Sequence, residues 1–196
     1  MTVEVVRSTL LAARQALDEL LNNDTALTRI EQAARALIGT LEAKGRVFSC
    51  GNGGSMCDAM HFAEEMTGRF RNNRPGLAAI AISDASHLSC VANDFGYDSV
   101  FSRYVESHGR PDDALLAIST SGKSQSVVNA ATAARTMGMK VVALTGRASS
   151  PLEALADVCI CCPGGAYADR SQELHIKVIH ILIELVERRF HPENHR

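Results

Sequence analysis

From Arg46 onward, short apolar runs alternate with longer stretches that have the residue spacing of helices. The apolar runs each have four to six residues and occupy residues 47–50, 77–82, 114–119, 140–145 and 158–162. Strands that alternate with helices are typical of βαβ units, which form a parallel sheet with helices on both faces. We therefore expect an α/β fold built on a doubly wound, mainly parallel five-stranded sheet flanked by helices.

Residues 1–44 precede the first strand and carry apolar residues at helical spacing in two runs. The runs separate at residues 22–24, where the side chain of Asp24 can cap the second helix. Two helices ahead of the first strand cannot both cover one sheet unless one extends beyond it, so we expect the first helix to pack against another subunit. We predict an oligomer.

The composition provides material for one well-buried core, since 46% of the 196 residues are hydrophobic. We therefore expect a single domain over residues 1–196. Within it, the N-terminal helices occupy residues 1–44, the α/β core residues 45–190 and a polar tail residues 191–196.

Charge and hydropathy argue against several classes of partner. The net charge is −2 and the pI about 6.4, so no excess of Lys or Arg favours nucleic acid or an anionic membrane. Residues 1–11 lack a basic region followed by an apolar stretch, and no run of about 18 apolar residues occurs. We expect a protein that is neither exported nor inserted into a membrane.

Six cysteines lie mostly inside apolar runs, which is typical of reduced core thiols in the cytoplasm. Cys159 and Cys162 form a CxxC pair, but no second pair of Cys or His stands at zinc-ribbon spacing. We interpret this pair as strand packing.

Two strand-to-helix turns have the composition of anion-binding loops. The first loop, residues 50–55, reads Cys-Gly-Asn-Gly-Gly-Ser, and the second loop, residues 119–124, reads Ser-Thr-Ser-Gly-Lys-Ser. Ligands of open α/β sheets bind at the carboxyl ends of strands. Glycines allow close backbone approach, and hydroxyls with N–H groups at a helix N-terminus suit a phosphate monoester. Either loop alone could equally be an ordinary Gly and Ser turn.

Neither loop completes a nucleotide-binding motif. Ala117 stands where a P-loop requires its first glycine, and Met56 occupies the sixth position of a GxGxxG sequence. We expect no nucleotide cofactor.

Acid and base groups lie on two predicted helices. His61 and Glu65 are four residues apart and share a helix face. Gln172 and His180 are eight residues apart on a strongly apolar C-terminal helix over about 168–190, and both can reach one site. An aldose–ketose isomerisation needs a base for the proton alpha to the carbonyl and an acid for the oxygens, roles that Glu and His can fill.

The same four side chains offer nitrogen and oxygen ligands for a divalent ion such as zinc, which could polarise the carbonyl. Two simpler interpretations remain. His61 and Glu65 could be an exposed surface pair, and a histidine on a buried helix is more often a core residue, which is our interpretation of His175.

Six segments together resemble the phosphoheptose isomerase family of the sugar-isomerase (SIS) domain superfamily: residues 50–55, 61–65, 92–95, 118–122, 144–146 and 172–180. The resemblance extends over nearly the whole chain, and the combination of segments with Glu65 and His180 carries it. It implies a flavodoxin-like SIS domain and a cytoplasmic homotetramer. It also implies conversion of sedoheptulose 7-phosphate to D-glycero-D-manno-heptose 7-phosphate, the first step of heptose synthesis for lipopolysaccharide or other glycoconjugates.

The resemblance also implies roles for individual residues. Glu65 and His180 would be the catalytic acid–base pair, and one zinc ion per subunit would be bound by His61, Glu65, Gln172 and His180. The implied substrate contacts are Asn52, Gly53, Gly54, Ser55, Glu65, Asn93, Asp94, Ser119, Thr120, Ser121, Ser124 and Gln172. Asp169 would support the site from behind the ligands or from a neighbouring subunit.

Met56 and Lys123 depart from the family pattern; Lys123 adds a cation near the phosphate. A rival interpretation is a non-catalytic SIS protein that binds the replication initiator or senses a sugar phosphate. That protein needs the two loops but no acid–base pair, so Glu65 and His180 favour catalysis. A third alternative keeps the chemistry on a pentose or amino-sugar phosphate.

Overall fold

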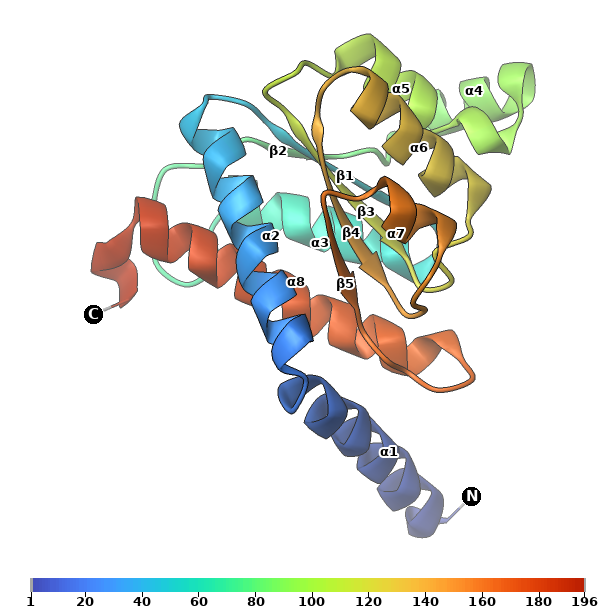
Figure 1. Cartoon of the computed structure of the whole chain (residues 1–196), viewed down its shortest axis with the longest axis vertical. Coiled ribbons are helices and arrows are strands. Elements are labelled where there is room, and N and C mark those ends of the chain that lie inside the picture. Colours follow the sequence, from blue (N-terminus) through green and yellow to red (C-terminus); the bar gives the residue numbers. More distant parts are fainter. Residues whose placement is uncertain (1, 196) are drawn as a thin grey trace.

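The computed structural model describes residues 2–195, in which strands and helices alternate after two N-terminal helices (Figure 1). The elements in chain order are α1 (Val3–Leu21), α2 (Asp24–Glu42), β1 (Val47–Gly51), α3 (Gly54–Thr67), β2 (Ala79–Ala81), α4 (Ala85–Phe95), η1 (Tyr97–Ser99), α5 (Ser102–His108), β3 (Ala114–Ser119), α6 (Gln125–Thr136), β4 (Lys140–Thr145), α7 (Pro151–Leu155), β5 (Val158–Cys161), α8 (Ala168–Phe190) and η2 (Pro192–His195).

The five strands form one sheet in the order β2-β1-β3-β4-β5, and every neighbouring pair is parallel. The predicted doubly wound five-stranded fold is confirmed. Only β2 is clearly shorter than expected, because the N–H of Leu77 donates to the carbonyl of Met66 at the end of α3. The chain therefore joins the sheet two residues later than the apolar pattern predicts.

Helices cover both faces of the sheet. One core cluster joins the sheet to α1, α2, α3 and α8, and a second joins it to α4, α5, α6 and α7 (Figure 1). Strand β3 shows how the faces divide: Leu116 and Ile118 pack in the first cluster, and Leu115 and Ala117 in the second. Successive side chains of a strand point to opposite faces, so a strand buried on both faces is a continuous apolar run.

The cysteine pair also lies on two faces. Cys162 belongs to the first core cluster, whereas Cys159 packs against the second. All six cysteines are free, and Cys57 and Cys90 are exposed at helix surfaces. The strand-packing interpretation of the CxxC pair agrees with this arrangement.

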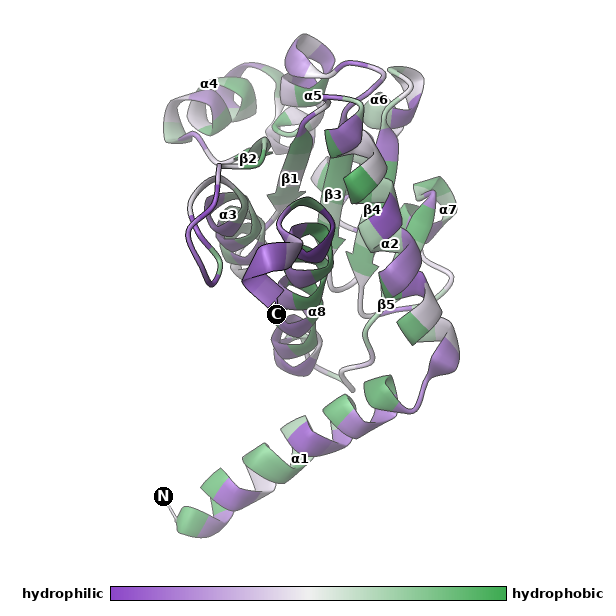
Figure 2. Cartoon of the chain, turned by 90° about the vertical axis from the view of Figure 1, so that its left-hand side faces the viewer, coloured by the Kyte–Doolittle hydropathy of each residue, from purple (hydrophilic) through white to green (hydrophobic). Residues whose placement is uncertain are grey.

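Helices α1 and α2 have equal length and different surroundings. Helix α2 buries seven of its 19 residues, whereas α1 buries only Ala16 and Leu20. Figure 2 shows α1 projecting away from the sheet with apolar and polar residues along its surface. Exposed apolar residues of α1 include Val3, Leu10 and Leu21. Helix α1 therefore extends beyond the sheet, and its packing against another subunit stays a prediction.

The prediction that Asp24 caps α2 is wrong by one residue. Asn23 is the N-cap, and its side-chain oxygen accepts a hydrogen bond of 3.0 Å from the N–H of Ala26. Either residue type can cap, and the backbone of Asn23 has the non-helical conformation that the cap needs. Asp24 is the first helical residue, where its negative charge is still favourable.

The C-terminal residues 192–195 form η2, which folds back against α8. His195 Nε2 lies 3.3 Å from Glu187 Oε2, and both side chains are almost completely buried. The polar composition of this tail does not predict that docking. Among the described residues, no helix has both the length and the apolar character that crossing a membrane requires.

Candidate active site

The two glycine- and serine-rich loops lie side by side at the carboxyl edge of the sheet. Strands β1 and β3 are paired, with Gly51 opposite Ile118, and their loops enter α3 and α6 on opposite faces of the sheet. Asn52 Nδ2 joins the first loop to the start of α6 by donating to Ser126 Oγ at 3.0 Å. Neighbouring strands with helices on opposite faces create a crevice in which open α/β sheets bind ligands.

The first loop brings exposed backbone close to a second helix. Gly53 is the N-cap of α3 and has φ of 56°, a conformation that strains residues with a side chain. A Cβ at Gly54 would lie 2.6 Å from Nε2 of Gln172, because the Gln172 carboxamide packs on this turn. The loop therefore offers N–H groups at a helix N-terminus, where an anion is stabilised.

The second loop gathers hydroxyl groups. Ser119 Oγ lies 3.1 Å from Ser124 Oγ and 3.4 Å from Ser121 Oγ. Gly122 has φ of 63°, and a Cβ there would overlap the side chain of Ser150. The turn therefore requires glycine at position 122, and the side chain of Ser150 packs directly against it.

A cavity of about 180 Å³ opens beside the second loop and is lined by Thr120, Ser121, Arg147, Ala166, Tyr167, Ala168 and Ser171. Arg147 adds an exposed cation that donates to the carbonyl of Ala166 at 3.4 Å. Reasoning from the sequence missed Arg147, although it follows β4 at the same edge of the sheet and that position is a signal.

Three side chains from α3 and α8 converge beyond the first loop. His61 Nε2 lies 3.3 Å from Glu65 Oε1 and 3.4 Å from His180 Nε2, and one ligand atom of each residue lies within 4.8 Å of the others. We call these three residues the His–Glu–His cluster. The prediction that His61, Glu65 and His180 reach one point agrees with this geometry.

Burial shifts the pKa values of groups in and near the cluster. The pKa of His180 is lowered mainly by burial and to a smaller extent by the neighbouring His61, whereas Glu65 acts to raise it. The pKa of Asp58, one turn before His61 on α3, is raised to about 6 by burial. A neutral imidazole and an ionised carboxylate are the states that bind metal or remove a proton.

The cluster could hold a metal ion. Ligand atoms that stand ~2.0–2.1 Å from a tetrahedral zinc are ~3.3–3.4 Å apart, and the two closest pairs of the cluster are 3.3 and 3.4 Å apart. Glu65 Oε2 is buried and has no hydrogen-bond partner among residues 2–195. Two imidazoles and a carboxylate are also a donor set that zinc accepts.

Comparison with known proteins identifies the family of this chain. A sequence model of the SIS domain family matches residues 12–146. Phosphoheptose isomerase of Aeromonas hydrophila is 59% identical over 94% of this chain and 96% of its own. The solved phosphoheptose isomerase of Neisseria gonorrhoeae is 38% identical with a TM-score of 0.87, and covers 94% of this chain and 97% of its own. That of Francisella tularensis is 34% identical with a TM-score of 0.89, and covers 96% and 100%.

The chain belongs to the phosphoheptose isomerase family of SIS-domain proteins. Within this family member, several predicted site residues stand apart from the cluster. Asn93 and Asp94 are exposed at the end of α4, where Asn93 Nδ2 donates to Asp94 Oδ1 at 2.7 Å. Asp169 is exposed in the first turn of α8, 3.3 Å from Arg170. Gln172 lies at the first loop, two turns before His180.

Other residues of this phosphoheptose isomerase family member have roles that sequence patterns did not predict. The Tyr97 hydroxyl donates to Asn52 Oδ1 at 2.8 Å, so both ends of the Asn52 amide are engaged within the chain. Met56, which departs from the family pattern, packs against the second core cluster, and Lys123 is exposed.

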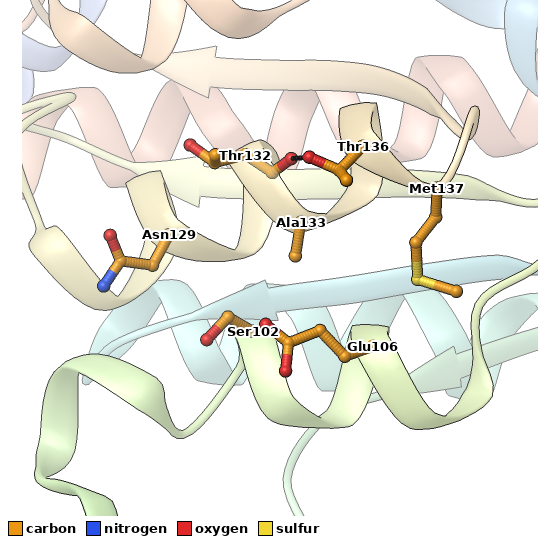
Figure 3. A pocket seen from close by; sticks show the side chains of 7 residues that line it. All are labelled: Ser102, Glu106, Asn129, Thr132, Ala133, Thr136 and Met137. Atoms are coloured by element: carbon orange, nitrogen blue, oxygen red, sulfur yellow. Dashed lines mark hydrogen bonds between the residues drawn. The ribbon is translucent and has the colours of Figure 1, made fainter.

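A second cavity, of about 370 Å³, lies between α5 and α6 (Figure 3). Thr132 and Thr136 line it, and each hydroxyl donates to a helix carbonyl at 3.0 Å. Asn129 donates to the carbonyl of Asp98 at 3.0 Å. Because these polar groups are already bonded within the chain, we assign the cavity no part in catalysis.

Proposed function

We propose that this chain is an aldose–ketose isomerase that converts sedoheptulose 7-phosphate to D-glycero-D-manno-heptose 7-phosphate. The convergence of Glu65 and His180 near two phosphate-suited loops carries the proposal. The isomerase name of relatives that are 57–59% identical over 94% of the chain supports it.

Glu65 would act as the base. Its carboxylate would remove a proton from C1 of the ketose, which gives an enediol, and the proton would return to C2 to leave an aldehyde at C1. His180 would move the accompanying proton between the two oxygens. The lowered pKa of His180 keeps its imidazole neutral near pH 7, so that it can accept as well as donate.

The two loops would hold the phosphate at the other end of the sugar. His61 follows Gly54 by seven residues on α3, a rise of ~10 Å along the helix axis. A substrate that bridges this distance carries its carbonyl far from its phosphate, as a seven-carbon ketose phosphate does. Ser119, Ser121 and Ser124 would bind phosphate oxygens, with Arg147 at the rim.

Zinc would be held by His61, Glu65 and His180, and Gln172 would complete the set by turning from the first loop. Bound there, it would polarise the carbonyl group of the substrate. The three residues of the cluster would then be fixed in orientation.

The proposed function also extends to the oligomeric state, the cellular location and the use of the product. We propose a homotetramer in which α1 covers its exposed apolar residues, such as Val6 and Leu10, against other subunits. Sedimentation at micromolar concentration tests this, and a monomer would contradict it. Free cysteines favour a cytoplasmic enzyme. Its product would enter heptose synthesis for lipopolysaccharide or another glycoconjugate.

The test is an assay of the purified protein with sedoheptulose 7-phosphate, beside pentose and amino-sugar phosphates as alternatives. We expect turnover of the heptulose phosphate with the highest kcat/KM of the set. Binding of the sugar phosphate without turnover would instead support a non-catalytic SIS protein.

A further inference from the structure

Arg74, in the segment between α3 and β2, has a charged side chain that is completely buried near the site. Its side chain has no exposed surface, and neither has that of its partner Glu187. Arg74 Nε donates to Glu187 Oε1 at 2.7 Å. Burying a charge costs free energy unless it is paired and hydrogen-bonded, so the partners of this buried guanidinium show what its burial stabilises.

The other guanidinium nitrogens of Arg74 bond to backbone carbonyls, mainly at the end of α3. Nη2 donates to the carbonyl of Glu65 at 2.7 Å, and Nη1 to the carbonyl of Met66 at 2.6 Å. Nη1 also lies 3.2 Å from the carbonyl of Gly68. The last four carbonyls of a helix have no partner within the helix, and Glu65 and Met66 supply two of these in α3. Arg74 therefore caps the helix turn that carries the proposed base.

The acidic partner of Arg74 lies on the helix that carries His180. Glu187 follows His180 by seven residues on α8, and its second oxygen lies 3.3 Å from His195 Nε2. The Arg74–Glu187 pair thus joins the end of α3 to α8. These are the two helices whose side chains form the His–Glu–His cluster.

We propose that Arg74 is a positioning residue for the isomerisation. It acts through the backbone of Glu65 and thereby fixes the position of the Glu65 carboxylate relative to His180. It contacts neither substrate nor metal. The inference rests on the proposed function, because the role of Glu65 is assigned there. Displacement of a reacting group by about 1 Å can reduce a rate about 10²-fold, so a fixed helix end has catalytic consequences.

A second ion pair, in which Asp113 is buried and Arg46 is partly exposed, provides the control. Arg46 Nη2 lies 2.7 Å from Asp113 Oδ2, and the same guanidinium donates to the carbonyl of His108. This pair stands at the amino ends of β1 and β3, the edge of the sheet opposite the loops. Its loss should reduce stability without moving the cluster.

The experiment compares Arg74→Lys with Arg46→Lys and the unaltered protein in thermal unfolding and in steady-state kinetics, well below the lowest Tm. Lysine keeps the charge but lacks the planar fork that reaches several acceptors at once. We expect Arg74→Lys to reduce kcat at least about tenfold, with KM changed less than about threefold. Arg46→Lys should reduce Tm and change kcat less than about twofold. An unchanged kcat in folded Arg74→Lys would overturn the proposal.

A measurement independent of activity accompanies the kinetics. The N–H of Gly68 bonds to the carbonyl of Glu64 at 2.7 Å, and we expect its hydrogen exchange to be at least about tenfold faster in Arg74→Lys but not in Arg46→Lys. If the unaltered protein shows no turnover, the proposed function fails while this exchange still tests the positioning. Unchanged exchange at Gly68 contradicts the positioning role by itself.

Should Arg74→Lys fail to fold, Glu187→Gln takes its place. The amide oxygen still accepts from Arg74, but the counter-charge is lost, so the guanidinium is held less firmly. A fall in kcat of at least about threefold at constant KM supports the proposal, and an unchanged kcat overturns it.

Discussion

The two loops and the His–Glu–His cluster are built in different ways. Each loop takes its groups from six consecutive residues, and its function depends on glycines, N–H groups and hydroxyls. The cluster takes three side chains from two helices that are far apart in the sequence and adjacent in space. We therefore propose that the loops supply binding, whereas the cluster supplies the chemistry.

A large effect on kcat should come from removing one of the two imidazoles of the cluster, that of His180. His180→Asn keeps a polar side chain but cannot move a proton near pH 7. We expect kcat to fall about 10²-fold to 10³-fold, with KM changed less than about threefold. Steady-state kinetics on the folded variant measures both. A variant with a raised KM and an unchanged kcat would assign His180 to substrate binding. The cluster would then not differ in function from the loops.

Removal of metal should affect the cluster and spare the loops. After chelation and dialysis we expect kcat to fall about 10²-fold, with zinc restoring it, because two imidazoles and a carboxylate would lose the ion that orients them. Elemental analysis before and after treatment gives the stoichiometry. Full activity in a metal-free sample would show that the three side chains act without an ion.

Two histidines of α8 separate stability from catalysis. His175 is buried, and burial lowers its pKa to about 4, from an ordinary value near 6.5. Because the unfolded chain binds the proton more readily, the folded state loses stability as the pH falls from about 6.5 to about 4, by about 3 kcal/mol at most. His175→Leu should remove this loss. Denaturant unfolding at pH 7 and pH 4.5 compares the two proteins, and an equal loss in both would contradict the assignment.

The smallest effect should come from the second loop and should appear in KM. Alanine at Gly122 would meet both an unfavourable φ and the side chain of Ser150, so the hydroxyls would shift. We expect KM to rise about tenfold, with kcat changed less. Gly138→Ala is the control, because Gly138 also has positive φ but lies before β4 at the opposite edge. Equal KM values in both variants would refute a role for the second loop in binding.

Much of this arrangement follows from local patterns in the sequence. The strands are continuous apolar runs because they are buried on both faces, and the loops follow two of them directly. Helical spacing places His61 beside Glu65, and the apolar length of α8 predicts its burial. Asn23 and Asp24 are both capping residues, so composition alone could not choose between them.

The contacts that could not be predicted join residues that are far apart in the sequence and belong to no common helical or strand pattern. Arg74 and Glu187 are separated by 113 positions, and nothing in the pattern of either segment marks the pair. The contact between Tyr97 and Asn52 is of the same kind. Helices α1 and α2 have similar apolar spacing, so only the structure shows that one is covered and the other projects.

The central claim is that the carboxylate of Glu65 performs the proton transfer while the loops hold the phosphate. The most direct test measures sedoheptulose 7-phosphate binding and turnover together in Glu65→Gln, whose amide nearly matches the carboxylate in shape. We predict a Kd within about threefold of the unaltered protein and a kcat at least about 10³-fold lower. Turnover near the normal rate would contradict the account.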